Sequence, residues 1–295
     1  MDSVYLITGG ASGLGRALAI SLANKSEFSN RNKLKICIAD VHEQRGLETV
    51  TQLQQQNVDA FYQHCDITCA EDVEKLKQAM LDKWSRVDVV INNAGVATGG
   101  DLQSETIEQW QWVLNINLLG MVRVSQCFLE VFKLQNRGYF INISSQAGLT
   151  PIPLMSSYNA VKSAVVGLSE TMKLELGQYN VDVSVVCPSF FRTNLDENTR
   201  SNDAHAGKLM NKLFEKANLS SMDVANQILK QSLKRPFLIL THDEGRKTYL
   251  LKKLLPNAWY LKLMAKQTRR MLKKPNTESK LQPSQNSAEV KGVAK

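Results

Sequence analysis

The chain has 295 residues, of which 43% are hydrophobic and 22% charged, and its formal net charge is +8. This composition excludes a disordered or fibrous protein and is typical of a globular chain with a sizeable core. Residues 1–200 contain 17 Lys and Arg against 21 Asp and Glu, whereas residues 201–295 contain 19 against 7. The positive charge is therefore a property of the last third of the chain and not of its body.

Cysteine usage and the first residues give an expectation for the compartment. The five cysteines are odd in number, form no CxxC pair and have no nearby histidine at metal-ligand spacing, so neither a disulfide framework nor a metal site is expected. The chain enters an apolar run without the pattern of a signal peptide, and it has no run of 18 apolar residues. We predict a cytoplasmic protein.

Seven short β-branched runs alternate with helical stretches, which predicts an α/β fold with a Rossmann-type, doubly wound parallel sheet in a single domain. Ser220 and Asp223 match a capping box that would start a helix running to about residue 234, before the last strand. We place the domain at residues 1–245, a basic helical extension at 246–274 and a disordered tail at 275–295. The predicted strands are residues 4–8, 35–39, 60–65, 87–91, 139–144, 181–186 and 237–241.

The first predicted strand leads directly into a glycine-rich turn and then a helix. Gly9, Gly13 and Gly15 would allow a tight turn whose backbone N–H groups approach a pyrophosphate at the helix N-terminus. Asp40 ends the second strand, 25 positions after Gly15, where a carboxylate would bind the ribose hydroxyls and repel a 2′-phosphate. This pattern favours NAD(H), with NADP(H) as the alternative.

Further polar residues follow other strands, at the edge of an open α/β sheet where ligands bind. Asp66 and Ile67 follow the third strand, and Asn93 begins a short motif after the fourth. After the fifth strand come Ser145, then Tyr158 and Lys162, which lie four apart and so share one helix face. An ammonium near a phenol stabilises the phenolate and lowers its pKa, which suits Tyr158 to proton transfer.

From residue 4 to about residue 241 the chain resembles the short-chain dehydrogenase/reductase family, through six motifs in the family's order and spacing. They are the turn from Thr8 to Gly15, the run from Asn92 to Gly95, Asn117 within residues 115–120, Ser145, Tyr158 with Lys162, and residues 188–193.

The resemblance implies a catalytic tetrad. Tyr158 would be the general acid/base, and Lys162 would lower its pKa and bind the nicotinamide ribose. Ser145 would orient the substrate oxygen, and Asn117 would hold a water of a proton relay, while the cofactor supplies the hydride. The family usually has Pro-Gly where this chain has Pro188 and Ser189, and a serine tolerates positive φ less well than a glycine. The residues expected to bind the cofactor are Gly9, Ser12, Gly13, Leu14, Gly15, Asp40, Asp66, Ile67, Asn93, Ala94, Gly95, Tyr158, Lys162, Pro188, Phe191 and Thr193.

Two apolar, mostly uncharged segments border the substrate cleft in the resembling family, one before Tyr158 and one after residue 193. We therefore expect a long-chain, isoprenoid or sterol-like alcohol or carbonyl compound. Reduction of an acyl thioester or 3-oxoacyl group, and a catalytically idle dinucleotide sensor or scaffold, are the alternatives. The same side chains could instead pack in the core or form a dimer contact. The resemblance suggests a homodimer or homotetramer. The candidate substrate residues are Gln146, Leu149, Phe190, Leu195 and Leu213.

The extension 246–274 contains ten basic residues and no acidic one. Tyr260, Leu263 and Met264 can share a face opposite its lysines and arginines, a composition typical of an interfacial amphipathic helix. One interpretation is peripheral association with the anionic inner membrane surface. The other is packing of the apolar stripe on the body or across a subunit interface. No nucleic-acid partner is expected, because no recognised binding module is present.

Overall fold

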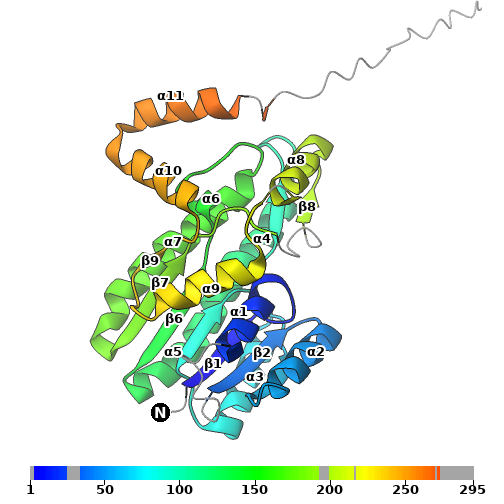
Figure 1. The fold of residues 1–295 in the computed structure, drawn as a ribbon, viewed down its shortest axis with the longest axis vertical. Helices are drawn as coiled ribbons and strands as arrows, with labels where there is room; N and C mark the ends of the chain where they lie inside the picture. The colour runs from blue at the N-terminus through cyan, green and yellow to red at the C-terminus, as the bar shows by residue number, and fades with distance from the viewer. Residues whose placement is uncertain (1–2, 25–33, 193–198, 216, 270, 273–295) are drawn as a thin grey trace, which may run out of the picture.

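The computed structural model describes residues 3–24, 34–192, 199–215, 217–269 and 271–272. Seven parallel strands form one sheet in the order β3-β2-β1-β4-β6-β7-β9, which confirms the predicted doubly wound fold (Figure 1). The strands are β1 (Ser3–Thr8), β2 (Leu34–Asp40), β3 (Asp59–His64), β4 (Val89–Asn92), β6 (Gly138–Ile143), β7 (Val181–Val186) and β9 (Leu238–Ile239).

Helices cover both faces of the sheet because its central strands are apolar on both sides. On one face, α1 (Gly13–Asn24), α2 (Glu43–Gln54) and α9 (Ser221–Ser232) share a buried cluster with the strands. On the other face the covering helices are α3 (Ala70–Trp84), α5 (Met121–Gln135) and α7 (Ser156–Leu176). The predicted capping box at the start of α9 is confirmed, with Ser220 and Asp223 bonded reciprocally.

The structure differs from the sequence prediction in two places, a second small sheet and the length of the last strand. A second, two-stranded parallel sheet pairs β5 (Ala97–Gly99) with β8 (Thr199–Ser201). The last strand covers two residues and not the five predicted. The remaining elements are α4 (Ile107–Leu114), the π-helical segment η1 (Asn115–Gly120), α6 (Gln146–Leu149), the 3-10 turn η2 (Gly177–Tyr179), α8 (Ala204–Glu215), α10 (Asp243–Leu254) and α11 (Asn257–Thr268).

One continuous helical run in the described chain, Ile107–Gln135, is long and apolar enough to cross a membrane by length and composition alone. Its last part, α5, packs Val124, Phe128 and Phe132 against the sheet, where all three are fully buried. That run therefore has the packing of a core helix.

Candidate functional site

A single cavity of about 830 Å³ follows the carboxyl ends of the strands. It begins at the turn after β1 and continues past α7 to the extension, so it joins segments from both ends of the described chain. Gly15, Asn117, Leu149 and Leu213 do not line it, and Thr193 and Leu195 lie outside the described residues. The predicted residues that line it are Gly9, Ser12, Gly13, Leu14, Asp40, Asp66, Ile67, Asn93, Ala94, Gly95, Ser145, Gln146, Tyr158, Lys162, Pro188, Phe190 and Phe191.

The glycine-rich turn is held by close backbone contacts. Gly9 has φ of +65°, and a Cβ atom there would lie 2.7 Å from the Cα atom of Ala94. A Cβ atom on Gly15 would lie 2.1 Å from the carbonyl oxygen of Gly9. The Asn93 side-chain amide donates to the carbonyl oxygens of Thr8 and Gly9, both at 3.0 Å. Gly15 therefore allows α1 to approach the backbone of the turn closely without lining the cavity. The Asn93 side chain bonds the turn to the end of β4.

Two carboxylates in the nucleotide part of the cavity are fixed by local bonds. Asp40, which is buried, accepts from the backbone N–H groups of Ala11 and His42, both at 3.0 Å. Asp66 accepts from the backbone N–H and the hydroxyl of Thr68, both at 2.8 Å. The Asp40 carboxylate is thus anchored directly beside the glycine-rich turn.

The cavity has a nucleotide part beside the glycine-rich turn and a far part that is mainly apolar. Tyr158 and Lys162, on the first turns of α7, line the cavity between these two parts. The Lys162 ammonium donates to the carbonyl oxygen of Ile143 at 3.1 Å and lies 5.7 Å from the centre of the Tyr158 ring. Burial raises the pKa of Tyr158 to about 12, opposed by a hydrogen bond with Ser145. Burial lowers the pKa of Lys162 to about 8. Desolvation is the largest cause of both shifts, because it disfavours the charged form of each group.

Asn117 lies behind the cavity wall in η1 and is almost fully buried. Its side-chain carbonyl oxygen accepts from the N–H of Val96, and its amide donates to the carbonyl oxygen of Val96, both at 2.8 Å. Both polar atoms of the amide hold the segment after β4, while Asn115 of the same π-helical segment lines the cavity. Asn115 in turn accepts from Arg123 at 3.0 Å.

The Ser189 position, where the sequence departs from the resembling family, is accommodated without backbone strain. Ser189 is not among the non-glycine residues with positive φ in the described chain. Its N–H donates to His242 Nδ1 at 3.2 Å. Burial lowers the pKa of His242, which favours the neutral ring that this bond requires. A residue just before α10 therefore supports the segment after β7.

The far part of the cavity is mainly apolar, and several of its side chains were not predicted. Phe214 of α8 packs edge-on against Phe190, with ring centres 5.3 Å apart, whereas the sequence prediction selected its neighbour Leu213. Leu149 instead packs in a buried cluster with Val165 and Leu240. Helical spacing could have indicated Trp112, one turn before Asn115. Ile152, Met155 and Phe214 lie in the two apolar segments that were expected to border the cleft, although they were not among the selected substrate residues. Lining side chains missed from the sequence include Trp112, Asn115, Glu244, Thr248, Met264 and Gln267.

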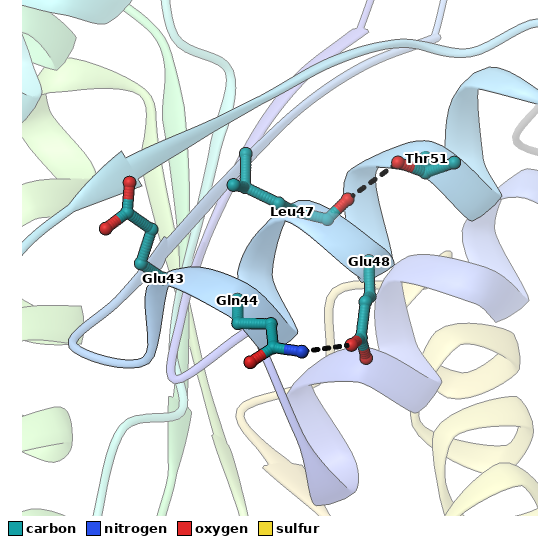
Figure 2. Close-up of a pocket in the computed structure, with 5 residues that line it drawn as sticks. All are labelled: Glu43, Gln44, Leu47, Glu48 and Thr51. Atoms are coloured by element: carbon teal, nitrogen blue, oxygen red, sulfur yellow. Dashed lines mark hydrogen bonds between the residues drawn. The ribbon is translucent and has the colours of Figure 1, made fainter.

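A second hollow lies along one exposed face of α2 (Figure 2). All five lining residues come from this one helix, and their side chains bond within it: Gln44 to Glu48 at 3.4 Å and the Thr51 hydroxyl to the Leu47 carbonyl at 2.9 Å. A single helix face does not enclose a ligand, so the large cavity is the candidate active site.

Comparison with known families and proteins agrees with this geometry. The family model for short chain dehydrogenases matches residues 3–204. An uncharacterized oxidoreductase of Thermotoga maritima is 30% identical over 185 residues, which cover 63% of this chain and 70% of that protein. A 3-oxoacyl-[acyl-carrier-protein] reductase of Synechocystis sp. is 31% identical over 196 residues, or 66% of this chain and 76% of that enzyme.

Among solved structures, a short chain dehydrogenase/reductase from Burkholderia phymatum in complex with NAD has a TM-score of 0.78 and 30% identity. The match covers 85% of this chain and 93% of that one. Xylitol dehydrogenase, solved with NAD⁺ bound, has a TM-score of 0.60 and 27% identity over 64% of this chain and 70% of that one.

Proposed function

Because the chain belongs to the short-chain dehydrogenase/reductase family and is an oxidoreductase that uses a nicotinamide dinucleotide, we propose that it interconverts an alcohol and a carbonyl on a hydrophobic substrate. One observation carries the proposal: a single cavity places a nucleotide part and an apolar part on either side of Tyr158 and Lys162. The residues present fit the cofactor, since side-chain-free backbone at Gly9 and Gly13 faces the cavity beside the Asp40 carboxylate.

The proposed chemistry assigns each step to a side chain at the junction. The bound nicotinamide would give or accept the hydride. Tyr158 would exchange the proton with the substrate oxygen, and Ser145, which lines the same cavity, would orient that oxygen. Lys162 would stabilise the phenolate and bind the ribose. The contacts of Asn117 support a positioning role for its side chain, because Val96 uses both of its polar atoms.

The lining of the far part supports an apolar substrate. Trp112 of α4, and Ile152 and Met155 of the connection between α6 and α7, line the cavity together with the Phe190 and Phe214 pair. Such a lining transfers a lipophilic chain out of water at a gain of about 25 cal/mol per Å² of buried apolar surface. A long-chain, isoprenoid or sterol-like alcohol or carbonyl compound fits this environment.

The first test is the proton-transfer role. Tyr158→Phe keeps the ring and removes the hydroxyl, so we expect kcat to fall about 100- to 10,000-fold while the Kd for NADH changes little. Tyr260→Phe is the matched control, because it removes a buried hydroxyl that has no hydrogen-bond partner in the described chain. Turnover retained by Tyr158→Phe would reject the assignment.

The second test concerns the cofactor. We propose a preference for NAD(H), because the anchored Asp40 carboxylate would repel a 2′-phosphate. Asp40→Ser should shift the ratio of kcat/KM for NAD over NADP toward NADP by at least about tenfold. An unchanged ratio would show that another residue discriminates between the cofactors.

A second candidate reaction is reduction of a 3-oxoacyl thioester, favoured by the resemblance to the Synechocystis enzyme. A substrate screen across chain lengths, as free alcohols and as acyl thioesters with both cofactors, separates the two. Tight NADH binding without any turnover would instead support a dinucleotide sensor. A homodimer or homotetramer, a cytoplasmic location at the inner membrane surface, and the boundaries at residues 245 and 274 stay predictions.

A further inference from the structure

The extension forms a two-helix arch of α10 and α11 that projects from the body beside α6 (Figure 1). At one end the Lys252 ammonium donates to the carbonyl oxygen of Leu149, and Gln146 donates to the carbonyl oxygen of Gly245 at 3.1 Å. At the other end His205 Nε2 donates to the carbonyl oxygen of Met271 at 2.8 Å. The arch thus links α6 to α8.

The inner face of the arch belongs to the candidate site. Glu244, Gly245 and Thr248 of α10 line the cavity, as do Met264 and Gln267 of α11. The apolar stripe predicted on the extension therefore faces the cavity in part, and the arch forms part of its mouth.

The outer face of the arch exposes large apolar side chains. On α10, Leu250 and Leu254 are 55% and 73% exposed. On α11, Trp259 and Leu261 are 67% and 63% exposed. Side chains of this size leave a substantial apolar area in water on two adjacent short helices, which is typical of an interaction surface.

Basic side chains accompany these apolar ones. No acidic residue occurs between residues 246 and 274, and the two acidic residues of the arch, Asp243 and Glu244, both lie in the first turn of α10. Beyond that turn the charge of the arch is therefore positive only. A second copy seated symmetrically on this face would bring like charges together, whereas an anionic lipid surface complements both the charge and the apolar groups. The exposed basic residues of the arch are Arg246, Lys247, Lys253, Lys262, Lys266 and Arg269.

We propose that the outer face of α10 and α11 docks on an anionic lipid surface, so that the cavity mouth lined by the same helices receives its apolar substrate from the membrane. The docking stands on the arch alone, and the substrate route rests on the proposed function. Leucine and tryptophan side chains would enter the headgroup boundary while the basic residues contact lipid phosphates.

Docking is tested by co-sedimentation of the full chain with vesicles of phosphatidylcholine, with and without phosphatidylglycerol, at low salt. We expect binding only to the anionic vesicles. Binding should fall at least about tenfold in the apolar variant Leu254→Gln/Trp259→Gln/Leu261→Gln. The charge variant Lys253→Glu/Lys262→Glu/Lys266→Glu should show a loss of similar size.

The matched control is Leu134→Gln/Leu174→Gln, which changes leucines that are 90% and 85% exposed on α5 and α7, and its binding should be unchanged. Equal recovery of the unmodified chain in the supernatant with both vesicles would overturn the proposal. A change from dimer to monomer in the apolar variant, without any vesicle binding by the parent chain, would show a contact between copies and also overturn it.

The substrate route is tested by comparing a water-soluble short-chain alcohol with a lipophilic alcohol dissolved in anionic vesicles. The apolar variant should lose at least about tenfold in turnover of the vesicle-dissolved alcohol and retain turnover of the soluble one. Equal loss with both alcohols would reject membrane delivery. If the parent chain oxidises neither alcohol, the proposed function fails, while vesicle binding still decides the docking.

Discussion

At the scale of single residues, burial opposes ionisation of Tyr158 and Lys162. The pKa of the lysine is lowered to about 8, far below its ordinary value of 10.5, because its ammonium is desolvated. An unfolded chain therefore binds a proton at this lysine more tightly than the folded chain does. Between about pH 8 and about pH 10.5 the unfolded state holds more protons, so the folding stability should rise with pH across that window. Placing a lysine here costs stability at neutral pH.

Lys162→Met tests this cost. The substitution removes a buried charge but leaves the carbonyl oxygen of Ile143 without its donor, so we expect a net gain of about 1–2 kcal/mol in the free energy of unfolding near pH 7. Turnover should be lost. Denaturant unfolding at several pH values measures the stability, and the variant should lack the rise above about pH 8.

Lys173→Met, on the same helix, is the control for that experiment. Lys173 forms a partly exposed ion pair with Asp182 at 2.8 Å, so its loss should cost at most about 1 kcal/mol without creating a rise above pH 8. A Lys162→Met protein that is less stable than the parent at every pH would contradict the proposed cost of burial.

The glycine-rich turn was predictable from the sequence, whereas the support of Ser189 was not. Gly9 and Gly15 lie in one local pattern, and their close contacts follow from the strand, turn and helix that contain them. The partner of Ser189 is His242, 53 positions away, and nothing in the local sequence indicates that they meet. The contacts of Asn117 with Val96 likewise depend on tertiary packing.

Among the elements, α7 carries the proposed catalytic pair, and a distant segment of the chain binds its first turn. Met155 precedes the helix and supplies no side-chain cap. Glu105, from the segment before α4, accepts instead from the N–H of Ser157 at 2.7 Å, one residue before Tyr158. The carboxylate is buried, and its second oxygen has no hydrogen-bond partner in the described chain. Desolvation raises the pKa of Glu105.

Glu105→Gln keeps an acceptor for Ser157 and removes the charge. Because the folded pKa is raised, the protonated Glu105 side chain contributes most to stability at acid pH, and stability falls as pH rises from about 4.5 through the raised value. The glutamine variant should therefore match the parent near pH 4 and exceed it at pH 7 in thermal unfolding. Glu105→Ala should lose about 1–3 kcal/mol at both, since it leaves the Ser157 N–H unpaired. Equal losses in both variants would show that the carboxylate charge is needed.

The main strands and α9 were predicted because their signals are local: apolar runs for the strands and a capping box for the helix. The pairing of β5 with β8 was not, because three-residue strands separated by about a hundred positions have no periodicity of their own. The π-helical turn η1 was also missed. An amphipathic pattern predicts a helix there without showing that its hydrogen bonds run one residue further.

At the scale of the whole molecule, the uneven charge distribution coincides with the architecture. The body is mildly acidic, and the basic residues gather on an arch at the cavity mouth. From the sequence alone the apolar stripe of the extension was open to either membrane contact or packing on the body. In the structure both faces are used, with Tyr260 buried inward and Trp259 exposed outward.

The last prediction concerns the contact between the arch and α6, which Gly245 and Gln146 form. Gly245 is buried, and a Cβ atom there would lie 2.6 Å from Gln146 Oε1, so Gly245→Leu should displace Gln146 or lift α10. We expect the KM for a lipophilic substrate to rise about tenfold, with the Kd for NADH unchanged because the nucleotide part is built by other segments. Adding Gln146→Ala should restore part of the loss. Gly167→Leu, at a helix position with open space, is the control. A raised Kd for NADH in Gly245→Leu would instead mean that the arch supports the whole site.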